Sequence, residues 1–198
     1  MPFDTLLAEE IWEQKYRFRS TSKEDADLAA TLDRVAGAVA KAEKPAKRKP
    51  WTARFGAALT DFKFIPGGRI LAGAGTARHV TLFNCFVMGT IPDDLPGIFE
   101  HLREAAITMQ QGGGVGMDFS TIRPSGAPVV GVGAHASGPL SFMDTWDAMC
   151  RTIMSAGQRR GAMMGCLRID HPDIEAFIDA KREGARFRNF NLSVLVTD

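Results

Sequence analysis

The sequence predicts an α/β protein, in which a helical N-terminal region precedes a parallel sheet or barrel. Apolar residues recur at helical spacing near the N-terminus, and from about Leu82 onward short apolar strands alternate with amphipathic helices. Such alternation indicates parallel strands joined by crossover helices. With 198 residues, of which 45% are hydrophobic and 24% charged, the composition suits one soluble globular domain, or one domain with a small appendage.

Residues 1–60 form the expected helical region. Within residues 5–40, Leu7, Ile11 and Trp12 follow a helical period, and a second helix is expected from about Ser22 to residue 40, with Ser22 as its cap. Residues 41–50 (KAEKPAKRKP) are basic and contain prolines and few apolar side chains. This pattern predicts an exposed linker.

Residues 61–198 are expected to form the α/β domain. The predicted strands are 82–89, 115–119, 162–169 and 192–196; the predicted helices are 95–109, 141–156 and a short one that begins at Pro172. The last predicted strand lies just before the final residue, Asp198, with no helix after it. Because a parallel sheet buries both of its faces, we expect an incomplete fold.

The bulk properties exclude several classes of protein. A net charge of +1 gives no global attraction to nucleic acid or to an anionic membrane. No apolar run approaches the roughly 20 residues needed to span a bilayer, and the first residues lack the layout of a signal peptide. We therefore expect a cytoplasmic protein with no direct nucleic acid or membrane partner.

Three glycine-rich stretches could approach a ligand, namely 66–69, 112–116 and 157–161. Glycines let backbone N–H groups approach phosphate or sugar oxygens, and arginines accompany two of the stretches. Their spacing matches neither a P-loop nor a dinucleotide-binding fingerprint. Together they predict a nucleotide-like ligand on an unusual scaffold, although each alone fits a tight connection in an α/β fold.

The three cysteines are Cys85, Cys150 and Cys166, and no Cys-x-x-Cys or paired histidine spacing accompanies them. A metal site is therefore not predicted. On residue type alone, each cysteine fits a buried small apolar side chain. Cys85 is expected inside a strand, where it could face a ligand cavity, and His171 is expected simply to start a helix.

Three motifs, in this order, resemble the large subunit of ribonucleotide reductases, most closely the adenosylcobalamin-dependent class II enzymes. They are Phe83–Phe86 (FNCF), Gln110–Gly116 (QQGGGVG) and Arg159–Met164 (RRGAMM), and the N-terminal IWEQKY is also typical of these enzymes. The resemblance covers roughly the whole chain. It implies the first part of a ten-stranded α/β barrel that consists of two five-stranded halves.

The resemblance also implies a reaction. Ribonucleotides, as diphosphates or triphosphates, become 2′-deoxyribonucleotides after adenosylcobalamin initiates a thiyl radical on a finger-loop cysteine. Two further cysteines supply the electrons and form a disulfide, which thioredoxin or glutaredoxin reduces. Cys85 matches the first cysteine of that redox pair.

The resemblance also implies roles for individual residues. The implied substrate-binding residues are Gly68, Arg69, Asn84, Cys85 and Gly114. The implied residues for a deoxynucleotide or ATP effector are Asp93, Asp94 and Arg123, and those of a specificity loop are Gln158, Arg159, Arg160 and Gly161. Helices 95–109 and 141–156 match those that form a four-helix homodimer interface.

Other parts of the family pattern are missing, including the radical-bearing cysteine, the partner of Cys85 and most of the cobalamin surface. We therefore expect a fragment that is inactive alone. Two alternatives stay open. One is a class I large-subunit fragment, which needs a radical-generating partner protein; the other is a non-catalytic nucleotide-binding module that dimerises through its two apolar helices.

Overall fold

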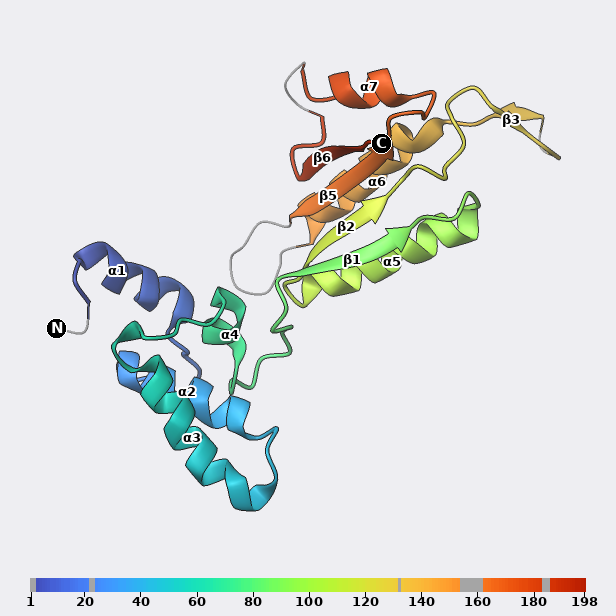
Figure 1. Ribbon diagram of the computed structural model, residues 1–198. Helices are drawn as coiled ribbons and strands as arrows, with labels where there is room; N and C mark the ends of the chain where they lie inside the picture. Colours follow the sequence, from blue (N-terminus) through green and yellow to red (C-terminus); the bar gives the residue numbers. More distant parts are fainter. Residues whose placement is uncertain (1–2, 22–23, 132, 154–161, 183–185) are drawn as a thin grey trace. The chain divides into compact units, whose positions relative to one another are not determined.

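The computed structural model describes residues 3–21, 24–131, 133–153, 162–182 and 186–198. They divide between Asn84 and Cys85 into two compact units, shown in Figure 1. This division differs from the expected one at residues 60 and 61. The reason is packing, because residues beyond 60, such as Leu71 and Ala74, join Val35 and Leu59 in one apolar cluster.

The N-terminal unit is helical, as predicted. Its elements are α1 (Leu6–Ile11), a π-helical turn (Trp12–Tyr16), α2 (Leu28–Ala40), α3 (Pro45–Leu59), a 3₁₀ turn (Thr60–Phe62) and α4 (Gly68–Gly73). The second helix begins later than expected from Ser22, which lies outside the described residues. Asp27 caps it instead, since its carboxylate accepts a hydrogen bond from the Ala30 N–H at 2.8 Å.

The prediction of a linker over residues 41–50 is wrong from residue 45 onward, where α3 begins. Pro45 occupies a first-turn position, which needs no backbone N–H donor, and Pro50 lies inside the helix. The C-terminal half of α3 carries Phe55 and Leu59, which pack in the apolar cluster with α2. This packing stabilises a helix whose basic first half stays exposed.

A buried ion pair joins α2 to α4 within this unit. The side chains of Asp25 and Arg34 are each 3% exposed and lie 2.9 Å apart. The Arg34 guanidinium also donates to the backbone oxygens of Leu71 and Ala74, and Asp25 accepts from the Phe18 N–H and the Thr31 hydroxyl. Every charged group of the pair is thus hydrogen-bonded, as burial requires.

The second unit is built on a parallel sheet, as predicted. Its strands are β1 (Cys85–Thr90), β2 (Gly114–Asp118), β5 (Met163–Arg168) and β6 (Phe190–Leu195), in the order β1-β2-β5-β6. Its helices are α5 (Leu95–Gln110), α6 (Gly138–Thr152) and α7 (Ile174–Asp179). A short antiparallel ribbon of β3 (Pro128–Val129) and β4 (Ala134–His135) was not expected.

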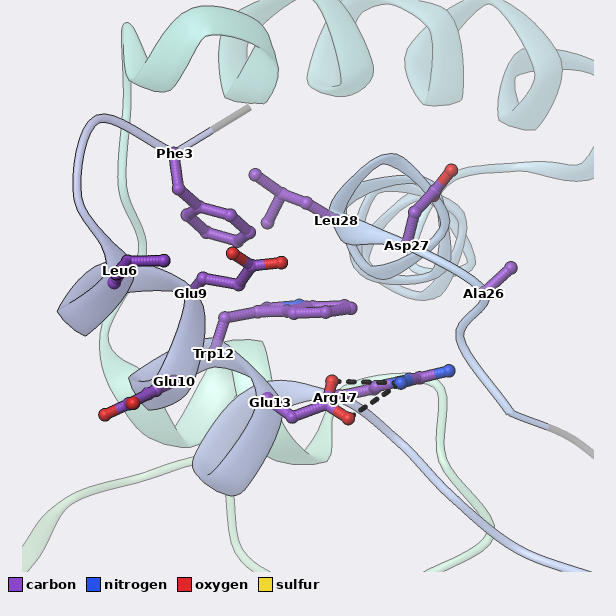
Figure 2. Close-up of a pocket in the computed structure, with 10 residues that line it drawn as sticks. All are labelled: Phe3, Leu6, Glu9, Glu10, Trp12, Glu13, Arg17, Ala26, Asp27 and Leu28. Carbon is purple, nitrogen blue, oxygen red and sulfur yellow. Dashed lines mark hydrogen bonds and ion pairs between the residues drawn. The ribbon is translucent and has the colours of Figure 1, made fainter. Parts of the chain in front are cut away.

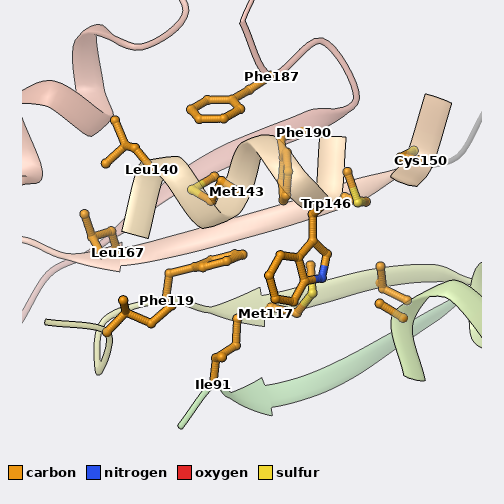
Figure 3. Packing of buried hydrophobic residues seen from close by; sticks show 14 of the residues in the cluster. Ile91, Met117, Phe119, Leu140, Met143, Trp146, Cys150, Leu167, Phe187 and Phe190 are labelled. Atoms are coloured by element: carbon orange, nitrogen blue, oxygen red, sulfur yellow. The ribbon is translucent and has the colours of Figure 1, made fainter. Parts of the chain in front are cut away.

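The core of this unit lies on one face of the sheet (Figure 3). Trp146 and Met143 of α6 pack there on Phe119 and Phe190, and the ring centroids of Phe119 and Trp146 are 5.5 Å apart. Burial alternates along β2 and β5, so successive side chains point to opposite faces. Among the described residues, the second face of the sheet is largely uncovered.

Candidate functional site

We call this second face of the sheet the open face. It consists of the residues that alternate with the core positions, namely Cys85 and Val87 of β1, Gly114, Gly116 and Asp118 of β2, and Met164 and Cys166 of β5. Val87 is 94% exposed and Met164 is 41% exposed. A face with exposed apolar side chains and glycines is suited to receive a ligand or further protein.

Cys85 is the first residue of β1, rather than a mid-strand residue as expected, and its thiol is free and exposed. In the parallel register its partner on β2 is Gly114. Paired residues on neighbouring strands lie about 4.8 Å apart. Two residues predicted from separate motifs to bind substrate therefore lie side by side, and Gly114 places no side chain between a ligand and the backbone.

The other two thiols have a different environment. Burial, with a smaller contribution from the Asp147 carboxylate, raises the pKa of Cys150 to about 11. Burial and the nearby Asp118 carboxylate also raise the pKa of Cys166. Burial and the raised pKa values make both thiols less reactive, whereas Cys85 is the exposed thiol of the three.

The remaining predicted substrate residues belong to the N-terminal unit. Gly68 starts α4, and a Cβ added to it would lie 3.3 Å from the Tyr16 hydroxyl. A Cβ on the preceding Gly67 would lie 3.8 Å from the Asn84 side-chain nitrogen. Asn84 and the turn that contains Gly68 and Arg69 are therefore neighbours, and their role toward a substrate stays a prediction.

The three predicted effector residues lie together at the start of α5. Arg123 donates from its backbone N–H and its Nε to the two carboxylate oxygens of Asp93, at 3.0 and 2.8 Å. Both side chains of this ion pair are about one-third exposed, at 37% and 33%. Asp94 caps α5 by accepting from the Gly97 N–H at 2.8 Å. This site joins a helix N-terminus to an accessible guanidinium.

Two further residues contact this region, and one of them, His171, was expected only to start a helix. The buried His171 is hydrogen-bonded to the Ile122 carbonyl oxygen at 2.9 Å, and Asp173 accepts from the Ser125 N–H at 2.9 Å. They therefore hold the loop that carries Arg123. The partners are 48 and 49 positions apart in the chain, and the spacing of the residues gave no signal of these contacts.

The predicted specificity loop, Gln158, Arg159, Arg160 and Gly161, lies outside the described residues. The described chain resumes at residue 162, directly before β5. Within the described part, no helix is long and apolar enough to cross a membrane.

The N-terminal unit contains a hollow that the sequence did not predict, with a volume of about 540 Å³ (Figure 2). Trp12 and Phe3 line it together with the carboxylates of Glu9, Glu10, Glu13 and Asp27. Arg17 also lines it, but its guanidinium is paired with Glu13 and Glu24. Because this lining is acidic, it repels phosphate groups, and the hollow is not suited to nucleotide binding.

Comparison with known proteins agrees with this geometry. Residues 83–198 match the family described as ribonucleotide reductase, barrel domain, and residues 2–79 match ribonucleotide reductase, all-alpha domain. The boundary between these matches is close to the division of the structure at residues 84 and 85.

Individual relatives carry consistent names. The chain is 38% identical over 199 residues to the vitamin B12-dependent ribonucleoside-diphosphate reductase of Mycobacterium tuberculosis (strain ATCC 25618 / H37Rv), which covers 98% of this chain and 28% of the relative. It is 41% identical over 146 residues to the protein of the same name from Thermoplasma acidophilum, covering 73% and 19%. The ribonucleoside-diphosphate reductase subunit alpha of Helicobacter pylori (strain J99 / ATCC 700824) is 32% identical over 124 residues, covering 63% and 16%.

The chain thus spans less than a third of the length of these relatives. The helical unit, the parallel sheet that follows it and the two family matches, which together cover residues 2–79 and 83–198, lead to one conclusion. This chain belongs to the ribonucleotide reductase family.

Proposed function

We propose that the chain supplies the N-terminal part of a B12-dependent ribonucleotide reductase that converts ribonucleotides to 2′-deoxyribonucleotides in the cytoplasm. The observation that carries the proposal is the pairing of Cys85 with Gly114 on the open face. It brings an exposed thiol next to backbone that has no side chain, where a ribose could approach both. The names of the most similar relatives support the reaction and the dependence on cobalamin.

In this proposal Cys85 is one of two thiols that provide the reducing equivalents. The ribose 2′-hydroxyl leaves as water and hydrogen takes its place at C2′. The two thiols together lose two electrons and two protons and become a disulfide. Thioredoxin or glutaredoxin then reduces the disulfide by thiol–disulfide exchange. Neither Cys150 nor Cys166 fits the second role, because their pKa values are raised and neither is exposed like Cys85.

Adenosylcobalamin would supply the radical that starts this reaction. As the resemblance implies, most of the surface that binds this cofactor is expected in the remaining part of the enzyme. We assign none of the described residues to the cofactor. The role of this chain is to bind and orient the ribonucleotide and to present the Cys85 thiol.

We also propose that Asp93, Asp94 and Arg123 bind a deoxynucleotide or ATP effector. The guanidinium of Arg123 stays partly exposed beside Asp93 and could donate to phosphate. The carboxylates of Asp93 and Asp94 could accept hydrogen bonds from the sugar and base of the nucleotide. Gln158, Arg159, Arg160 and Gly161 would link this site to the substrate. Gly68 and Arg69 would lie near the substrate phosphate, with Asn84 as a further contact.

Complementation tests the catalytic proposal. The 198-residue chain is combined with the remaining part of a homologous reductase, adenosylcobalamin and a dithiol, and deoxynucleotide formation is measured. We expect turnover with the unaltered chain. With Cys85→Ser we expect at most a single turnover, because the second electron donor is lost, while effector binding stays unchanged. Normal repeated turnover by Cys85→Ser would overturn the assigned role of this thiol.

A second candidate function is a nucleotide-binding module without catalysis. The effector site favours it, because Asp93, Asp94 and Arg123 all lie in this chain, whereas a second redox thiol has not been identified in it. Deoxynucleotide binding without product formation in the complemented sample would support this candidate. A third candidate, a class I large-subunit fragment, would be supported by turnover that requires a radical-generating protein instead of cobalamin.

A further inference from the structure

We infer that His171 and Asp173 are positioning residues that fix the loop presenting Arg123 to the effector. The inference rests on the effector role proposed for Arg123 and specifies how that side chain is held in place. The side chains of His171 and Asp173 are hydrogen-bonded to backbone atoms on either side of Arg123.

The loop between β2 and the β3–β4 ribbon is anchored at two points. On one side of Arg123, the Ile122 carbonyl oxygen lies 2.9 Å from His171 Nε2. On the other side, the Ser125 N–H donates to Asp173 Oδ2 at 2.9 Å. Arg123 lies between these anchors, one residue from the first and two from the second. Fixing both anchors restricts the backbone dihedrals that aim its guanidinium.

The imidazole of His171 is itself fixed. Its Nδ1 lies 3.0 Å from the backbone N–H of Asp173, which can only donate, so Nδ1 is the acceptor. The proton of the neutral ring is then on Nε2 and is donated to Ile122. The side chain is buried, at 7% exposed, and both ring nitrogens are engaged. One imidazole thus connects the start of α7 to the Arg123 loop.

The start of α6 packs closely around the second anchor. Gly138 has a φ of +78°, and a Cβ built on it would lie 2.8 Å from both Asp173 Oδ2 and the Ser125 backbone nitrogen. A side chain at this position would therefore separate the two groups. The Thr121 hydroxyl also donates to the carbonyl oxygen of Ile91, the residue that follows β1. Together these contacts keep Arg123 beside Asp93.

Two substitutions of His171 separate positioning from general stability. His171→Gln keeps a side-chain N–H near the position of Nε2 and can still donate to Ile122. His171→Asn keeps only an acceptor near the position of Nδ1. We expect His171→Asn and Asp173→Ala to bind deoxynucleotides roughly three- to tenfold more weakly, the loss expected for one hydrogen bond, and His171→Gln to bind within about twofold of the unaltered chain.

The measurement is calorimetric titration of the full chain with each of dATP, dGTP, dCTP and dTTP, with thermal unfolding recorded in parallel. Glu175→Gln, an exposed change on α7, is the matched control and should bind normally. If the role of His171 were only structural, both His171 variants would lower the unfolding temperature and their affinities would not differ. Unaltered affinity in His171→Asn would overturn the inference.

Hydrogen exchange separates failure of this inference from failure of the proposed function. If the unaltered chain binds none of the four deoxynucleotides, the proposed effector role of Arg123 is wrong. The anchoring is then tested by exchange of the Arg123 and Ser125 N–H groups, which donate to Asp93 and Asp173. Faster exchange in His171→Asn than in His171→Gln supports positioning, and equal exchange refutes it.

Discussion

At the scale of single residues, the three thiols should differ in reactivity. Cys85 is exposed, whereas burial and Asp147 raise the pKa of Cys150 to about 11. At pH 8 a thiol with that pKa has about a hundredfold less thiolate than one with the ordinary value of 9.0. We expect one rapid equivalent in a thiol titration with a disulfide reagent, and its loss in Cys85→Ser. A rapid phase that persists in this variant would contradict the exposure seen at Cys85.

At the scale of elements, the buried Asp25–Arg34 pair should make the packing of α2 against α4 less stable at acidic pH. Burial alone would raise the pKa of Asp25, but hydrogen bonds from Arg34, the Phe18 N–H and the Thr31 hydroxyl lower it below its ordinary value of 3.8. A depressed folded-state pKa stabilises the fold above the unfolded-state pKa. This stabilisation is lost as pH falls through the folded-state value.

Urea unfolding of the unaltered chain and of Asp25→Asn, followed by circular dichroism, tests this. At pH 6 we expect the variant to be less stable by about 3 kcal/mol, because Arg34 stays buried without its counter-charge. The difference should shrink below about pH 4, in the window where Asp25 of the unaltered chain takes up its proton. A difference that is constant from pH 6 to pH 2.5 would contradict the depressed pKa.

At the scale of the whole molecule, we propose that two chains pair through α5 and α6. These helices contact each other, and α5 presents Leu95, Phe99 and Ile107, which are 59%, 50% and 42% exposed. Exposed apolar side chains along one helix are suited to a symmetric interface. The proposal follows the resemblance of residues 95–109 and 141–156 to helices of a dimer interface.

Sedimentation equilibrium of Phe99→Glu tests this pairing. Because an aromatic side chain at the centre of an interface typically contributes 2 kcal/mol or more, we expect the dimer to dissociate at least roughly thirtyfold more readily. Ala57→Glu, which adds the same side chain at an exposed position of α3, is the control and should not change the association. A monomeric unaltered chain, or an unaffected variant, would refute an interface through α5.

The elements of the second unit were predictable because their local patterns agree with their packing. The apolar stripe around Trp146 predicts α6, and short apolar runs predict the strands. The helix α3 was missed because its first turns are basic and contain Pro50, and it is stabilised by contacts of Phe55 and Leu59 with another helix. The hydrophobic pattern of one segment does not show its contacts with another helix.

For the candidate site, the sequence indicated the residues but not how they lie relative to one another. The motifs indicated Cys85, Gly114 and Arg123, but not that the first two are register partners, since register depends on the whole sheet. The glycines of the Gln110–Gly116 motif also do not all have the same structural role. Gly112 has a φ of +91°, and a Cβ on Gly113 would lie 2.7 Å from the Phe86 ring. Backbone conformation and packing therefore explain these two glycines without a ligand.

The place of Cys85 in the chain has one practical consequence. It is the exposed cysteine of the three, the first residue of β1, and the residue that directly follows the N-terminal unit. A nitroxide attached through this native sulfur would give a spectroscopic label at the junction of the two units without any engineered cysteine. Its paramagnetic line shape would report how freely the junction tumbles, both in the chain alone and as nucleotides or the remaining part of a homologous reductase are added.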